Sequence, residues 1–238
     1  MSHILGYVCS DQVSPNSFSR TCSRSLSCTA HPDSSGVGLG WMQDDRSLLR
    51  NHPKPSPGLS PFLSLAADVP SRTVVGHVRA PGLSAVSGAD LAPFRFKKWL
   101  WVSADVQVFQ GTPIPLPDHI KQNLHGRSES EWLFHVVMRE FAKADVLEPS
   151  DADHQTIVDA VRSAFRVAAE HGITSTAPAI LATNKWMLGL RREDPLLYRV
   201  VSGYEIYDEP AFAGHKPKPR NFPTFRAALL TNATANKP

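Results

Sequence analysis

The sequence predicts an α+β protein in which two mainly antiparallel sheets carry helices on their outer faces. Strand-like segments fill the first half of the chain, two helical segments follow one another between 128 and 172, and strand-like segments then return. Strands and helices do not alternate one by one, which argues against a doubly wound parallel sheet. We expect residues 1–238 to form a single domain, with a loop-rich stretch over 10–35 and a C-terminal tail over 231–238.

The strands of the first half are predicted from short apolar or β-branched runs. Ile4–Val8 has the pattern of a buried strand, and Asp44-Asp45 marks the turn of a hairpin whose first strand is rich in glycine. Glycine inside a strand indicates that backbone or a ligand approaches it closely. Thr73–Arg79 is predicted to be a central strand because β-branched residues dominate its first half. The predicted strands of this half cover 4–8, 36–42, 48–50, 73–79, 99–102 and 106–109, with a short helix over 62–67.

Two helices are predicted in the middle of the chain, and four strands are predicted after them. The first helix begins at Ser128, a residue type that caps helix N-termini, with carboxylates directly after it. The second begins after Asp151 and ends at Gly172. Lys216–Arg220 is predicted to be a solvated loop, and the last strand is predicted to leave an exposed sheet edge for a partner. The later strands are predicted over 179–182, 186–190, 197–201 and 227–230.

Composition and charge argue against several classes of function. Hydrophobic residues make up 42% of the chain and charged residues 20%, as in soluble globular proteins. The net charge of +3 is small and the basic residues are scattered, so we expect no nucleic-acid partner. No apolar run approaches the roughly 20 residues that span a bilayer, and no secretion signal is visible, so we expect a cytoplasmic protein without a membrane partner. The cysteines and histidines match no metal-ligand spacing, so we expect free thiols, no metal site and no cofactor.

Several short segments, in order along nearly the whole chain, carry a family resemblance. They are Leu5-Gly6-Tyr7 after a small nucleophile at position 2, Gly38-Leu39-Gly40-Trp41, His77-Val78-Arg79, Asp90-Leu91-Ala92-Pro93-Phe94, Ser128-Glu129-Ser130-Glu131 and the stretch from Leu181 to Arg192. Taken together they resemble the class II glutamine amidotransferases, which are N-terminal nucleophile hydrolases. The subgroup that they resemble most is the stand-alone bacterial amidotransferase-like proteins. The resemblance implies the four-layer αββα sandwich of that superfamily.

The resemblance also implies a role for each site residue. The family's nucleophile is a cysteine at position 2 whose free α-amine acts as the base, and the residue here is Ser2. Arg79 matches the arginine that holds the glutamine carboxylate, and Glu129 stands in place of the aspartate that receives the substrate ammonium. The family builds its oxyanion hole from a His-Asn-Gly segment. The aligned residues here are Ser103, Ala104 and Asp105.

These substitutions leave two hypotheses open. A serine can act as a nucleophile beside a base, but Ala104 offers no side-chain donor and Asp105 would bring negative charge to the place where an oxyanion develops. The first hypothesis is a pseudoenzyme that keeps the scaffold as a binding subunit or as support for another protein subunit. The alternative is an amide hydrolase, a γ-glutamyl amide hydrolase or a glutamine amidotransferase that uses Ser2. Arg79 and Glu129 favour a glutamine-like or γ-glutamyl ligand. If they have no functional role, Arg79 is explained by a structural ion pair and Glu129 by favourable charge at a helix N-terminus.

Overall fold

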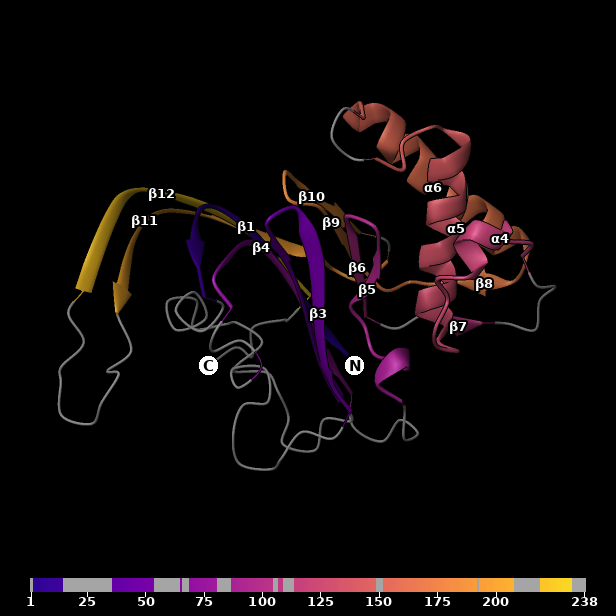
Figure 1. Ribbon diagram of the computed structural model, residues 1–238, viewed down its shortest axis with the longest axis horizontal. Helices are drawn as coiled ribbons and strands as arrows, with labels where there is room; N and C mark the ends of the chain where they lie inside the picture. The colour runs from indigo at the N-terminus through magenta and orange to yellow at the C-terminus, as the bar shows by residue number, and fades with distance from the viewer. Residues whose placement is uncertain are drawn as a thin grey trace.

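The computed structural model describes residues 2–14, 36–53, 65, 69–80, 87–104, 107–108, 114–148, 152–191, 193–207 and 219–232. Two antiparallel sheets lie face to face in this part of the chain, and the helices gather on one side of the pair (Figure 1). The predicted α+β class with two antiparallel sheets is therefore confirmed.

The larger sheet has six strands in the order β11-β12-β1-β4-β2-β3, and every neighbouring pair is antiparallel. Its two central strands are β1 and β4, as the β-branched run at Thr73–Arg79 predicted. The strands of this sheet are β1 (His3–Val13), β2 (Gly36–Gln43), β3 (Arg46–His52), β4 (Ser71–Arg79), β11 (Leu197–Tyr207) and β12 (Pro219–Thr231).

The smaller sheet has four strands in the order β10-β9-β6-β5, and a separate two-stranded ribbon pairs β7 with β8. Strands β5 and β8 were not predicted, because segments of three and two residues carry too little periodicity to be recognised. The strands of the smaller sheet are β5 (Phe94–Phe96), β6 (Trp99–Ser103), β9 (Ala179–Ala182) and β10 (Met187–Leu190), and those of the ribbon are β7 (Gln107–Val108) and β8 (Ile173–Thr174).

Glycines in β1 and β2 allow the two sheets to approach each other closely. A Cβ atom at Gly38 would lie 2.0 Å from the carbonyl oxygen of Ala92, which no side chain could tolerate. A Cβ atom at Gly6 would lie 2.6 Å from the sulfur of Met187. The glycine-rich pattern of β2 is therefore explained by a close approach of backbone, one of the two causes that the sequence left open.

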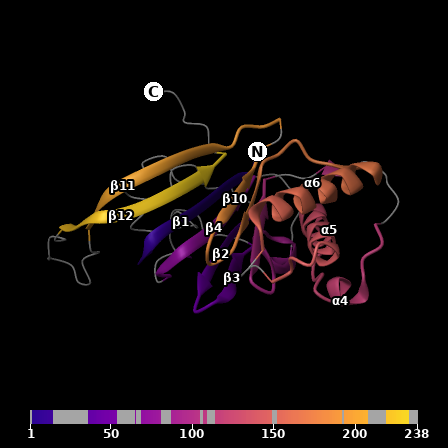
Figure 2. The same cartoon turned by 90° about the horizontal axis from the view of Figure 1, so that it is seen from above.

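Three helices cover the outer face of the smaller sheet (Figure 2). They are α4 (Asp118–Lys121), α5 (Glu129–Lys143) and α6 (His154–Glu170). The hydroxyl of Ser128 caps α5 by accepting the Glu131 N–H at 3.2 Å, and Asp153 caps α6 by accepting the Thr156 N–H at 3.0 Å. Gly172 follows α6 with a φ of 79°, the left-handed conformation typical of a helix end.

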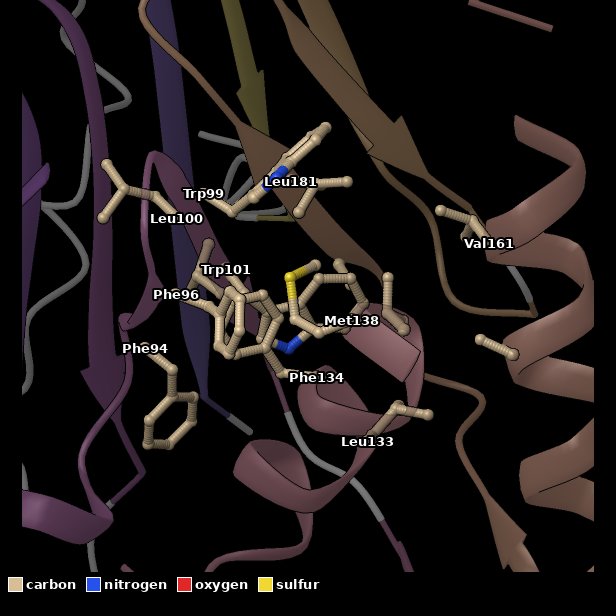
Figure 3. Close-up of a cluster of buried hydrophobic side chains, with 14 of the residues drawn as sticks. Phe94, Phe96, Trp99, Leu100, Trp101, Leu133, Phe134, Met138, Val161 and Leu181 are labelled. Carbon is tan, nitrogen blue, oxygen red and sulfur yellow. The ribbon is translucent and has the colours of Figure 1, made fainter. Parts of the chain in front are cut away.

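An aromatic core fixes α5 to the smaller sheet (Figure 3). The rings of Trp101 in β6 and Phe134 in α5 stack at 14° with their centroids 6.0 Å apart. Trp99 packs edge-on against Phe141, about two turns further along the helix, with the ring centroids 4.7 Å apart. Because all four side chains are buried, this core sets where the N-terminus of α5 lies relative to the end of β6.

A second buried cluster covers the outer face of the larger sheet. It contains Leu5, Tyr7, Val74 and Phe225 from the strands, together with Leu65. The helix predicted over 62–67 lies outside the described residues except for Leu65, which has helical conformation.

Two predicted boundaries in the loops are wrong. Strand β1 continues to Val13, so the loop-rich stretch does not begin at 10. The strand continues through its polar residues to Val13 because the side chains of Cys9 and Val13 are buried. The Tyr7 hydroxyl also donates a hydrogen bond to the Val13 carbonyl at 3.1 Å. Strand β12 begins at Pro219, so the loop predicted over 216–220 overlaps its start, because the backbone there pairs with β11.

The C-terminal end of the sheet also differs from the prediction. Strand β12 lies between β11 and β1 and is not an edge strand, and the edge at this side is β11. The predicted tail over 231–238 begins too early, because Thr231 is the last residue of β12 and Asn232 is buried. Within the described ranges, no helix combines the length and apolarity that crossing a bilayer would require.

Candidate functional site

Ser2 lies beside the C-terminal end of β4, at the start of the central strand pair. Antiparallel pairing places His3 opposite Val78, which brings the preceding residue next to Arg79 and Ala80. The Ser2 hydroxyl accepts the Ala80 N–H at 3.2 Å, and no part of Ser2 is exposed to solvent (0%). The Ala80 N–H therefore points at the predicted nucleophile and forms a structural hydrogen bond with it.

Asn232, which directly follows β12, holds the first residues of the chain by hydrogen bonds. Its amide nitrogen donates to the Ser2 carbonyl at 3.0 Å, and its amide oxygen accepts the Ile4 N–H at 2.8 Å. The neighbouring Thr231 hydroxyl donates to the Ile4 carbonyl at 3.1 Å. Sequence reasoning missed Asn232, because nothing in a polar C-terminal stretch indicates contact with a residue 230 positions away.

Arg79, the predicted carboxylate ligand, is half-buried at the last position of β4. Its Nη1 is buried and has no hydrogen-bond partner among the described residues. Arg79 forms no ion pair with any residue that the structure describes, so its structural explanation as an ion pair has no support there. A guanidinium nitrogen left in this state can receive a carboxylate oxygen from a ligand.

Asp90 holds the segment that precedes α5, and the positive charge of Arg79 acts on its carboxylate. It lies in the short 3-10 helix η1 (Gly88–Asp90), where its carboxylate accepts the Arg127 N–H at 2.6 Å and the Ser87 hydroxyl at 2.7 Å. Partial burial raises the pKa of Asp90, but these hydrogen bonds and the positive charge of Arg79 outweigh it and hold that pKa below its usual value. Sequence reasoning treated Asp90 only as part of a matching segment and missed this bridging position.

The two carboxylates at the start of α5 have different surroundings. Glu131 is buried, and its carboxylate accepts the N–H groups of His125 at 2.8 Å and Gly126 at 2.7 Å. Its role is therefore to hold the loop before the helix. Glu129, the predicted ammonium ligand, is exposed, with no side-chain hydrogen bond or ion pair to any described residue.

The predicted oxyanion segment follows β6 and is taken up by structural contacts. Ser103 is buried, and its hydroxyl makes a short hydrogen bond with the hydroxyl of Ser130 in the first turn of α5. The N–H of Ala104 donates to the Pro178 carbonyl at 3.2 Å. Asp105 lies outside the described residues. The family's backbone donor is the glycine N–H, which aligns with Asp105, so the structure describes only the neighbouring Ala104 amide, and that amide is already engaged.

The site therefore consists of two groups of residues. Ser2 and Ala80 are hydrogen-bonded at the end of β4 beside Arg79, while Ser103 is joined to the N-terminus of α5. A pocket of about 210 Å³ has Ala89 and Leu91 in its lining, on either side of Asp90 in the sequence, but Ser2, Arg79 and Asp90 do not line it. It is lined by residues that include Asn51, Gly88, Ala89, Arg95, His125 and Glu131. Among the residues that the structure describes, no three His, Cys, Asp or Glu side chains are grouped so that they could hold a metal ion.

Solved structures with the same fold include several amidotransferases. A glutamine aminotransferase class-II domain protein from Silicibacter pomeroyi matches with a TM-score of 0.55 and 14% identity, over 96% of this chain and 88% of that one. The glutamine phosphoribosylpyrophosphate amidotransferase of B. subtilis matches with a TM-score of 0.53 and 12% identity, over 97% of this chain. This chain spans only 41% of the B. subtilis enzyme. At these identities the likeness shows a shared fold.

The sequence itself carries the family assignment. No curated protein matches the chain. A family model described as class-II glutamine amidotransferases matches residues 1–199, which is most of the chain. The chain therefore belongs to the class II glutamine amidotransferase family.

Proposed function

We propose that this domain binds a glutamine-like or γ-glutamyl ligand through its carboxylate without hydrolysing it, and serves as a binding subunit beside another protein. The observation that carries the proposal is the state of Ser2. Its side chain is fully buried, and its hydroxyl is tied to the Ala80 N–H at 3.2 Å. A nucleophile has to come within about 3–3.5 Å of a substrate carbonyl in the right orientation. A buried hydroxyl does not meet that requirement.

The oxyanion segment supports the same proposal. Amide hydrolysis needs donors aimed at the oxygen that becomes negative, and loss of one such donor typically lowers the rate by about 10²–10³. Ala104 has no side-chain donor, and its N–H is bonded to Pro178. The family's asparagine donor is thus replaced by a side chain that cannot donate.

Ligand recognition has better support than catalysis. The buried Nη1 of Arg79 has no acceptor among the described residues, and a ligand carboxylate would supply one. Two N–H groups of one guanidinium can hold a carboxylate in a fixed orientation, which is the role that the family resemblance gives to this arginine. Exposed Glu129 stands free to meet a ligand ammonium, although at a weaker, solvent-screened position.

The alternative function is amide or γ-glutamyl amide hydrolysis by Ser2. The observation that favours it is the location of Ser2, next to the residue that follows Arg79. Opening of the first residues of β1 would bring hydroxyl and guanidinium to one ligand. Removal of Met1 would supply the free α-amine that serves as the base in the family.

A paired binding and activity experiment separates the two functions. Intact mass establishes whether Met1 is present, and γ-glutamyl amide hydrolysis is measured for the wild type and Ser2→Ala. Glutamine binding is measured by calorimetry for the wild type, Arg79→Met and Ser2→Ala. We expect binding that depends on Arg79 and not on Ser2, without hydrolysis. Hydrolysis that disappears in Ser2→Ala would establish the alternative, and absence of glutamine binding in the wild type would remove the ligand from the proposal.

A further inference from the structure

A groove runs between α6 and β10, on the helical side of the molecule. Its main part has a volume of about 520 Å³. A second depression of about 150 Å³ continues it and shares Val158 and Leu188 with the first. Together they extend along α6 from His154 to Ala169, which is about 22 Å at the rise of an α-helix.

The groove exists because the helices leave the edge of the smaller sheet incompletely covered. All four residues of β9 are buried, whereas all four of the neighbouring edge strand β10 are only partly buried. On the helix side, Val158 and Phe165 are also only partly buried. α6 and β10 thus form an apolar strip that no described helix covers.

Three arginines surround this apolar strip. Arg162 and Arg166 project from α6, and Arg191 follows β10. Arg162 pairs with Asp159 at 3.1 Å, but Arg166 and Arg191 make no ion pair or hydrogen bond with any residue that the structure describes. No carboxylate belongs to the described lining of either depression. A ligand of this groove should therefore carry acidic residues to pair with the arginines and an apolar face to pack on the strip.

We propose that this groove docks an acidic amphipathic helix of a partner protein, about 15 residues long. Apolar residues spaced i, i+3 or i+4, and i+7 would pack on Leu188, Leu190 and Phe165, as in other helix-in-groove complexes. Glutamate or aspartate residues on the flanks of that helix would meet Arg166 and Arg191. Docking of this kind does not depend on whether Ser2 reacts, because neither Ser2 nor Arg79 lines the groove.

Three synthetic helical peptides test the proposal by fluorescence anisotropy with the full chain. The first carries leucines in the pattern above and glutamates on its flanks. The second replaces the glutamates by lysines, and the third is a scramble of the first that keeps its composition but breaks the apolar stripe. We expect the first peptide to bind at least about tenfold more tightly than the other two, and more weakly as salt is raised.

Charge-reversal variants locate the site. Arg166→Glu and Arg191→Glu should each weaken binding of the first peptide about five- to tenfold, whereas the control Arg46→Glu, at an exposed position in β3, should leave it unchanged. Equal binding of the scrambled peptide, or no effect of either groove variant, would overturn the proposal. A dimer of the wild type that Arg166→Glu dissociates in sedimentation would assign the groove to a second copy instead. Glutamine binding, measured on the same variants, stays unchanged if the two sites are separate.

Discussion

The two halves of the candidate site at the end of β4 differ in how fully their polar groups are used. Ser2 is buried, its hydroxyl accepts the Ala80 N–H, and its carbonyl accepts the amide of Asn232. Arg79 directly precedes Ala80, yet its buried Nη1 has no acceptor among the described residues. Ser2 is thus built into the sheet, while Arg79 keeps a buried donor that has no partner among the described residues.

Under the proposed function, this difference reflects a site that keeps ligand recognition without catalysis. A buried donor without a partner costs about 1–3 kcal/mol, so it persists where something outside the fold satisfies it in use. The hydrogen bonds at Ser2, in contrast, contribute to folding whether or not a ligand binds. Substitutions on the nucleophile side should therefore change stability, and substitutions at Arg79 should change binding.

The largest effect on stability is expected from Asn232→Ala. The substitution leaves the buried Ile4 N–H and the Ser2 carbonyl without their partner, which should lower the free energy of unfolding by about 2–3 kcal/mol in urea denaturation. The matched control is Asn123→Ala, whose exposed side chain donates only to the His119 carbonyl and should cost less than about 0.5 kcal/mol. An equally small change in Asn232→Ala would show that the start of β1 is not held from the C-terminal side.

The largest effect on binding is expected from Arg79→Met. This substitution keeps an unbranched apolar stem and removes the guanidinium, so the affinity for a glutamine-like carboxylate should fall at least about tenfold in calorimetry. The free energy of unfolding should change by less than about 1 kcal/mol, because the lost Nη1 made no hydrogen bond to a described residue. A large loss of stability with unchanged affinity would reverse the assignment and make Arg79 structural.

The sequence predicts the fold better than it predicts the site. The central position of β4, the hairpin of β2 and β3 and both long helices follow from β-branched runs, turn residues and N-caps, all of which are local signals. The errors lie where pairing decides the structure. Strand β12 begins earlier than its composition suggests because β11 pairs with it, and Asn232 is buried by contacts with Ser2 that no local pattern contains.

The site shows the same division between local and long-range information. Ser2 and Arg79, which the family resemblance gave as site residues, lie at neighbouring positions because β1 and β4 pair. The resemblance could not show that the Ala104 N–H donates to Pro178, or that Glu131 rather than Glu129 is the buried carboxylate of α5. Those outcomes depend on how the ends of separate elements meet.

A smaller effect on stability is expected from changes to Ser2 itself. Ser2→Ala removes the acceptor of the Ala80 N–H and should lower the free energy of unfolding by about 1 kcal/mol. Ser2→Cys restores the family's thiol, but we expect no γ-glutamyl amide hydrolysis from it, because Ala104 still offers no side-chain donor to the oxyanion. Measurable hydrolysis by Ser2→Cys would show that the oxyanion site still works and that the nucleophile alone was lost.

The smallest effect is expected at Asp90, which holds the segment that precedes α5. Its pKa is held below the usual value in the folded protein, so its hydrogen bonds contribute stability above the unfolded pKa of about 3.9, and this stability is lost as pH falls through the folded pKa. When the pH is lowered from about 5 to about 2.5, the melting temperature of Asp90→Asn should therefore fall less than that of the wild type. Glu129→Gln also removes one carboxylate, but one that accepts no hydrogen bond from a described residue, and its acid profile should follow that of the wild type. If Asp90→Asn follows the wild-type profile as well, the contacts of Asp90 with Arg127 and Ser87 do not stabilise the segment that precedes α5.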